Sequence, residues 1–304
     1  MTGDVAVSSF SLKQQLGPIR LGYRDADGND AEFTLPMPQL IELEEFPALV
    51  REHCGVDLIE ICQIQFADPT DARIHAVRSA LETAAVGLLT VPIDVGNLAD
   101  HSADVRRGSE EAITGWFDIS AQLGSRFVRI NAGSPFQSQI DLSHVIESVD
   151  RLADAAAERG LGLLVENHGG PSSDPDVLIG LLEAIGGDRL GLLLDTGNFE
   201  PLISYASAAF TGQQTNSDDV DFAPVYERIE RLAPYARVVH AKAHEFRGDT
   251  HHPVDLERAL GLVKAAGFDG PITVEYEGNE GDPWKQTART VQLVRRVFER
   301  LPVA

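Results

Sequence analysis

Short apolar runs alternate with longer amphipathic stretches from one end of the chain to the other, and this alternation restricts the fold most. Apolar residues in the longer stretches recur every three or four residues, as on one face of a helix. Strands separated by helices pair in parallel through crossover connections. Eight such units in 304 residues predict an α/β fold with one closed (β/α)8 barrel. The predicted strands are residues 5–10, 58–64, 87–93, 126–132, 162–166, 191–195, 237–241 and 271–275.

Residues that are typical of helix starts and helix ends support this division of the chain. Glycine can adopt the left-handed conformation that closes a helix, and aspartate followed by proline is typical of a helix start. Asp174 and Pro175 therefore predict the first turn of one helix. Helix ends are predicted at Gly55, Gly87, Gly124, Gly160 and Gly267.

No linker or change of composition divides the chain, so residues 1–304 are predicted to form one domain. Two segments, residues 17–38 and 199–221, exceed what a barrel needs, and each follows the carboxyl end of a strand. Barrel enzymes build their sites from loops at that end. We expect these extended loops to be lids or subunit contacts, or else surface insertions.

The charge balance excludes polyanionic partners. The chain has 47 acidic and 25 basic residues, for a net charge of −22, and such a surface would repel nucleic acid. No apolar run approaches the roughly 20 residues that span a bilayer, and the first residues lack the features of a signal peptide. Cys54 and Cys62 are expected to be free thiols without a chemical role. We expect a cytoplasmic enzyme that binds neither nucleic acid nor membrane.

Metal-competent side chains occur in four successive predicted strands. They are Glu166, Asp195, His240 and Glu275, and each follows an apolar run. Three carboxylates that converge on one pocket would repel one another unless a cation or a proton intervenes. An oxygen-rich set with one nitrogen suits Mn²⁺ best, and also Mg²⁺, Co²⁺, Fe²⁺ or Zn²⁺. The sequence therefore predicts one divalent metal at the carboxyl end of the barrel.

Side chains two residues apart on a strand share a face, which places further polar groups beside the predicted metal. His168 is predicted as a general base or as a brace for Glu166, and Lys242 as a group that polarises a substrate oxygen or neutralises carboxylates. Glu166 and Glu275 are further candidates for proton transfer. The predicted substrate contacts are Asn131, Asn198, His244 and Glu277.

The last four predicted strands resemble the sugar isomerase/epimerase superfamily, whose members have a xylose-isomerase-like TIM barrel. The similarity rests on the four predicted ligands, on the HAK run around Lys242 and on VDLERALGLVKAAGFDGPITVEYEG. The resemblance implies that the four ligands bind a divalent metal. It further implies an isomerase or epimerase that acts on a keto-sugar by removing a proton next to a carbonyl that the metal polarises.

Two departures from the ketose 3-epimerases leave a second function open. Asn198 stands where those enzymes have a histidine, and Asn167 and His168 stand where they have a further glutamate. The ENH run resembles instead the larger subunit of bacterial C-glycoside deglycosidases, which pairs with a small β-rich subunit. That resemblance implies a lyase that cleaves a 3-oxo-glycoside with the histidine as base. The expected partner is then a small second subunit, whereas an isomerase or epimerase is expected to form a homo-oligomer.

Two other classes fit the sequence less well. A DNA-cleaving barrel of the AP-endonuclease type would need a basic groove and more than the nine histidines present here. A binding protein derived from an enzyme would be expected to have lost a metal ligand, yet all four are present. Isomerase or epimerase is the first expectation and lyase the alternative.

Overall fold

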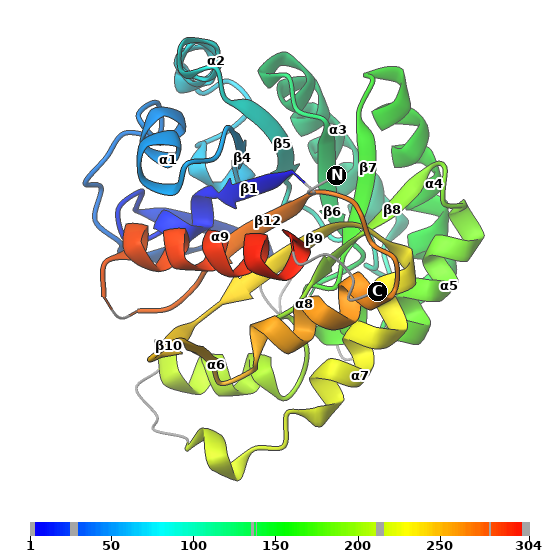
Figure 1. Cartoon of the computed structure of the whole chain (residues 1–304). Helices are drawn as coiled ribbons and strands as arrows, with labels where there is room; N and C mark the ends of the chain where they lie inside the picture. The colour runs from blue at the N-terminus through cyan, green and yellow to red at the C-terminus, as the bar shows by residue number, and fades with distance from the viewer. Residues whose placement is uncertain are drawn as a thin grey trace.

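The computed structural model describes residues 4–24, 30–134, 137, 139–210, 216–279 and 281–299. Eight parallel strands close into a barrel, which confirms the predicted (β/α)8 fold (Figure 1). In order around the barrel they are β1 (Val5–Ser8), β12 (Ile272–Tyr276), β9 (Ala236–Ala243), β8 (Leu190–Asp195), β7 (Gly162–Glu166), β6 (Phe127–Asn131), β5 (Gly87–Pro92) and β4 (Leu58–Glu60).

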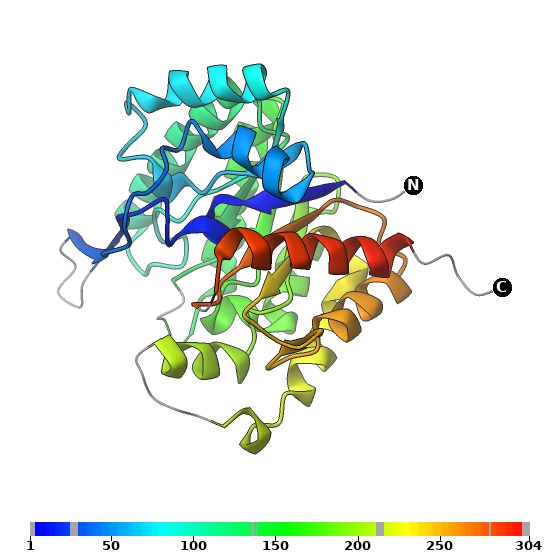
Figure 2. The ribbon, with the colours of Figure 1, turned by 60° about the vertical axis from the view of Figure 1, so that its left-hand side comes forward.

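Helices surround the barrel and bury their apolar faces against it (Figure 2). They are α1 (Phe46–Cys54), α2 (Arg73–Ala84), α3 (Ala103–Leu123), α4 (Leu142–Glu158), α5 (Pro175–Ile185), α6 (Leu202–Phe210), α7 (Ala223–Leu232), α8 (Leu256–Ala265) and α9 (Pro283–Glu299). None of the described helices is long and apolar enough to cross a membrane.

Six buried apolar side chains from six strands form a separate cluster inside the barrel. They are Ala6, Leu58, Leu89, Leu164, Leu193 and Val238. Because alternate residues of a strand share a face, the side chains two residues further along these strands also point inward. On five of the six strands those are polar: Ser8, Glu60, Glu166, Asp195 and His240. The apolar cluster is therefore the floor on which a buried polar layer rests.

Several strand ends differ from the prediction. The runs 5–10 and 58–64 are cut short because the chain turns into 3-10 helices at Ser9–Leu12 (η1) and Gln63–Gln65 (η2). The Ser8 hydroxyl accepts a hydrogen bond from the Phe10 N–H at 3.3 Å and so starts the first of these turns. In contrast, β9 continues to Ala243, where it still pairs with Tyr276 of β12.

The predicted helix boundaries are mostly correct. Gly55 and Gly124 end α1 and α3 in the left-handed conformation, and Asp174 caps α5 by accepting from the N–H of Asp176. Gly160 and Gly267 have positive φ just beyond α4 and α8. The prediction for Gly87 is wrong. The left-handed position after α2 falls on Ala85, with φ of 51°, and Gly87 is already the first residue of β5.

Both segments that were expected to be extended loops contain regular structure. Residues 17–38 include the antiparallel hairpin of β2 (Ile19–Arg24) and β3 (Asp30–Leu35), and residues 199–221 include α6. Residues 25–29 and 211–215 of these segments lie outside the described residues. A second hairpin, β10 (Glu245–Arg247) with β11 (Thr250–His252), follows β9.

Candidate metal centre

The four predicted ligands meet at one end of the barrel and are all buried. Glu166 and Asp195 end β7 and β8, while His240 and Glu275 lie in β9 and β12. The strand register brings them to one level, because Asp195 pairs with His240, and Glu275 pairs with Lys242, two residues further along β9. The sequence was sufficient to find this set because each residue ends or interrupts an apolar strand.

The His240 ring points its Nδ1 atom at all three carboxylates. Nδ1 lies 3.5 Å from Asp195 Oδ2, 3.8 Å from Glu275 Oε2 and 3.9 Å from Glu166 Oε1. Atoms that bind one Mg²⁺-sized ion at about 2.1 Å lie roughly 3–4 Å apart. Nδ1 is buried and makes no hydrogen bond to any described residue. This donor set, three carboxylates around an unbonded ring nitrogen, fits a divalent cation.

Glu60 at the end of β4 holds the other side of the His240 ring. Its Oε2 lies 3.0 Å from Nε2, and the carboxylate is fully buried. A carboxylate there keeps the proton on Nε2 and leaves the Nδ1 lone pair for a metal. Sequence reasoning missed Glu60. The available signal was an acidic residue on the inward-facing positions of an otherwise apolar strand.

Glu166 is held by two neighbours. The guanidinium Nε of Arg129 lies 2.7 Å from Glu166 Oε2, and the Asn198 amide donates to Glu166 Oε1 at 3.1 Å. Arg129, in β6, is itself buried and paired with Asp94 at 2.5 Å. Asn131 donates to Asp94 and accepts from Arg129 at 3.0 Å in both cases. The predicted substrate contacts Asn131 and Asn198 therefore both lie at the site, but each already bonds to protein groups.

Asp195 is fixed through its backbone and its side chain. The Asn167 amide accepts from the Asp195 N–H and donates to the Asp195 carbonyl, both at 2.8 Å. The Gly197 N–H donates to Asp195 Oδ1 at 2.6 Å. A side chain at position 197 would place its Cβ 2.5 Å from Lys242 Cδ, so this position requires glycine.

The Lys242 ammonium lies among the carboxylates. Nζ is 3.1 Å from Asp195 Oδ2, 3.1 Å from Glu275 Oε2 and 2.8 Å from Glu277 Oε1. It also donates to Asn198 Oδ1 at 3.1 Å. With these acceptors engaged, the geometry favours charge neutralisation over a free ammonium that polarises a substrate oxygen.

Besides His240, two imidazoles at the site have a buried Nδ1 without a hydrogen bond to any described residue: His168 and His244. Burial lowers the pKa of both rings, that of His244 to about 4, so both are neutral near pH 7. The His244 backbone is held by His251, whose Nε2 accepts the His244 N–H at 2.7 Å. His168 follows β7 directly and is a neutral, unbonded nitrogen base beside the ligand cluster.

The carboxyl groups divide into two pairs by pKa. Burial raises the pKa of Glu166 to about 7 and raises that of Glu275. Burial also opposes ionisation of Asp195 and Glu277, but the Lys242 ammonium lowers the pKa of both, that of Glu277 to about 2. Without a further cation the cluster therefore retains protons on part of its carboxyl groups, as expected when like charges share one site.

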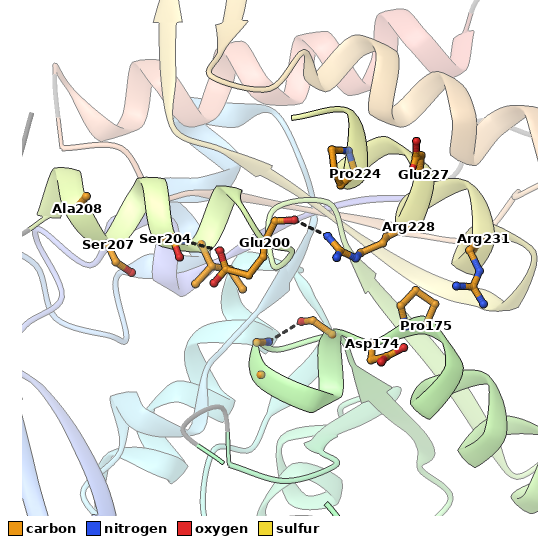
Figure 3. A pocket seen from close by; sticks show the side chains of 14 residues that line it. Asp174, Pro175, Glu200, Ser204, Ser207, Ala208, Pro224, Glu227, Arg228 and Arg231 are labelled. Atoms are coloured by element: carbon orange, nitrogen blue, oxygen red, sulfur yellow. Dashed lines mark hydrogen bonds between the residues drawn. The ribbon is translucent and has the colours of Figure 1, made fainter. Parts of the chain in front are cut away.

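A cavity lies beside the turn that follows His168, and the four ligands do not line it. Its volume is about 900 Å³, and it is bounded by the turn at Gly169 and Gly170, by the start of α5, and by α6 and α7 (Figure 3). Arg228 donates to the Glu200 carbonyl across it, and Arg231 pairs with Asp176. We place the chemistry at the carboxylate cluster, because that is where buried, unpaired polar atoms converge.

The family described as xylose isomerase-like TIM barrel matches residues 47–296. The chain belongs to this family. The confirmed resemblance concerns the family and its fold, and the roles predicted for individual site residues remain predictions. No curated protein sequence matches the chain.

Solved structures with the same fold cover nearly the whole chain. A D-allulose 3-epimerase from Methylomonas sp. has 13% identity and a TM-score of 0.66, over 97% of this chain and 98% of its own. A xylose isomerase-like TIM barrel protein from Mycobacterium smegmatis, in complex with magnesium, has 18% identity and a TM-score of 0.63, over 98% and 97%. A 3-keto-D-glucoside 4-epimerase from E. coli has 11% identity and a TM-score of 0.61, over 97% and 99%.

Proposed function

We propose that this protein is a metal-dependent epimerase or isomerase of keto-sugars, with Mn²⁺ as the preferred metal. The observation that carries the proposal is the ring of three carboxylates around His240 Nδ1, with the neutral His168 beside it. Glu166, Asp195, His240 and Glu275 would hold the metal. When bound, a divalent metal supplies Lewis acidity that stabilises negative charge developing on substrate oxygens.

His168 is the group best suited to remove the proton next to the substrate carbonyl. Its Nδ1 is unbonded, whereas the Glu166 carboxylate is engaged by Arg129 and Asn198. Removal of a carbon-bound proton by a positioned base contributes about 10²–10⁴-fold to rate. Glu275 is the second proton carrier. It lies on β12, separated from β7 by β9 and β8, so the two groups approach the pocket from different sides. Proton removal by one and return by the other inverts a carbon centre.

The alternative function is a lyase that cleaves a 3-oxo-glycoside. The order of residues after β7 favours it, because Glu166 is followed by Asn167 and His168 rather than by a second glutamate. The same base would remove the proton next to the 3-oxo group, and the aglycone would leave from the β position. The E. coli epimerase is named for a 3-keto-D-glucoside, so this fold accommodates that substrate class. A small second subunit is proposed with this function, and a homo-oligomer with the first.

A product assay separates the two functions. The Mn²⁺-loaded protein is incubated in deuterated water with D-fructose, D-allulose, D-tagatose, L-ribulose and an aryl 3-oxo-glucoside. An epimerase or isomerase interconverts ketoses that incorporate one solvent deuterium, and it releases nothing. Release of the aglycone without any interconversion of ketoses would refute the first function in favour of the lyase. The chelator-treated protein is the control.

A further inference from the structure

Lys13 is a second buried lysine at the carboxyl end of the barrel, and its side chain is only 6% exposed. It directly follows η1, and its neighbours in sequence are fixed to the end of β12. The Ser11 hydroxyl donates to the Val274 carbonyl at 3.2 Å and accepts the Tyr276 N–H at 2.9 Å. The Gln14 amide donates to the Gly278 carbonyl at 3.1 Å. These bonds hold Lys13 against the segment that carries Glu275 and Glu277.

The Lys13 ammonium has no hydrogen bond or salt bridge to any residue that the structure describes. Its one described partner is the Phe10 ring, whose centroid lies 5.2 Å from Nζ. Burial lowers the pKa of Lys13, and Glu277, Glu275 and Lys242 are the charged groups that also act on this pKa, so the ammonium lies within electrostatic range of the candidate metal site. Lys242, by comparison, has four acceptors within 3.1 Å.

An ammonium carries three donors, and no described residue accepts a hydrogen bond from Lys13 Nζ, although the residue as a whole is only 6% exposed. A ligand that fills the site would supply the missing oxygen atoms. The charge of the site selects among ligands. Six carboxylates meet three cationic side chains, and a divalent cation still leaves a net negative charge: Glu60, Asp94, Glu166, Asp195, Glu275 and Glu277 against Lys13, Arg129 and Lys242. A phosphate or carboxylate is therefore disfavoured, whereas hydroxyl oxygens can accept from Lys13.

We propose that Lys13 is a substrate-recognition residue that donates hydrogen bonds to hydroxyl oxygens of an uncharged sugar on the β1 side of the site. This inference rests on the proposed function and specifies its substrate class. Lys13 would contribute to affinity for the sugar and not to metal binding, because it contacts none of the four ligands within salt-bridge distance.

The test compares Lys13→Met and Lys13→Gln with Lys285→Met, an exposed lysine on α9. Each Mn²⁺-loaded variant is titrated calorimetrically with the ketoses and the 3-oxo-glucoside, and KM and kcat are measured for any sugar that reacts. Loss of a hydrogen bond from a charged donor weakens binding about 10–100-fold, so Lys13→Met should raise Kd and KM by that factor. Lys13→Gln, which retains a donor, should recover part of the affinity. Metal content and the Lys285→Met affinity should equal those of the unaltered protein.

Two results would overturn the inference. One is an unchanged Kd for every sugar in Lys13→Met, and the other is tighter binding of D-fructose 6-phosphate than of D-fructose. The inference is also rejected if none of the uncharged sugars binds the unaltered protein. If sugars bind without turnover and Lys13→Met weakens them, the inference is retained and the proposed reaction is rejected. If turnover occurs with an unchanged KM in Lys13→Met, the reaction is retained and the inference is rejected.

Discussion

The two halves of the barrel contribute different chemistry to the same site. Strands β7, β8, β9 and β12 supply the four metal-competent side chains. Strands β1, β4 and β6, with the segment after β5, supply groups that hold those side chains: Ser8 on Glu275, Glu60 on His240, Arg129 on Glu166 and Asp94 on Arg129. The first half supplies the candidate ligands and the second orients three of them, while Asn167, Gly197 and Asn198 of the first half also hold Asp195 and Glu166.

A set of candidate metal ligands therefore does not define the site on its own. Metal ligands act well only when their own orientation and protonation are fixed by a surrounding set of hydrogen bonds. The positioning half also engages Glu166, because Arg129 Nε lies 2.7 Å from one of its carboxylate oxygens. The contrast predicts graded effects of mutation.

Loss of a ligand should have the largest effect. Asp195→Asn keeps the shape of the side chain but removes the charge that faces His240 Nδ1 and Lys242. We expect loss of stoichiometric metal and of activity, measured by elemental analysis and by the product assay. Full metal occupancy with normal turnover would mean that the binding half is wrongly assigned.

Substitution of the base should separate chemistry from metal binding. His168→Ala is expected to lower kcat by about 10²–10⁴-fold while metal content stays normal, because the ring is not among the ligands. If metal affinity falls and kcat at saturating metal is retained, His168 belongs to the positioning group as a brace for Glu166.

A change in the positioning half should have an intermediate effect. Glu60→Gln preserves volume but offers Nε2 of His240 a weaker acceptor, so metal affinity should fall by about 10–100-fold. Metal titration at fixed pH measures it, and excess metal should restore most of the activity. An unchanged metal Kd would remove Glu60 from the positioning group.

A substitution on the outer helices should have the smallest effect on stability and on metal binding. Arg151 on α4 makes a two-point contact with Glu110 on α3, but its side chain is 57% exposed. Exposed ion pairs contribute roughly 0–1 kcal/mol. Arg151→Gln should change the free energy of unfolding by less than about 1 kcal/mol and leave metal binding intact. A larger loss in chemical denaturation would show that the outer layer is coupled to the site.

The two halves also differ in how far the sequence could predict them. Glu166, Asp195, His240 and Glu275 stand out because a charged residue in each of four successive apolar strands is unusual. Glu60 and Asp94 do not form such a series, and their partners lie 180 and 35 residues away in sequence. Only the closure of the barrel brings β4 across from β9. Lys13 does not belong to such a series either, because η1 replaces the predicted end of the first strand and Lys13 follows this turn.

Asn167 has a consequence for attempts to redesign this pocket. Its amide supplies both the acceptor for the Asp195 N–H and the donor for the Asp195 carbonyl. Asn167 therefore holds the end of β7 against the end of β8. An aspartate at position 167 would repel the Asp195 carbonyl oxygen. A leucine would leave both the Asp195 N–H and the Asp195 carbonyl without these hydrogen bonds. Position 167 is thus closed to libraries that aim at new substrates, whereas a change at His168 would leave these backbone hydrogen bonds intact and act on the proposed proton transfer. Substitution of these two adjacent residues of the ENH run should therefore fail for different reasons, one through the backbone and the other through the chemistry.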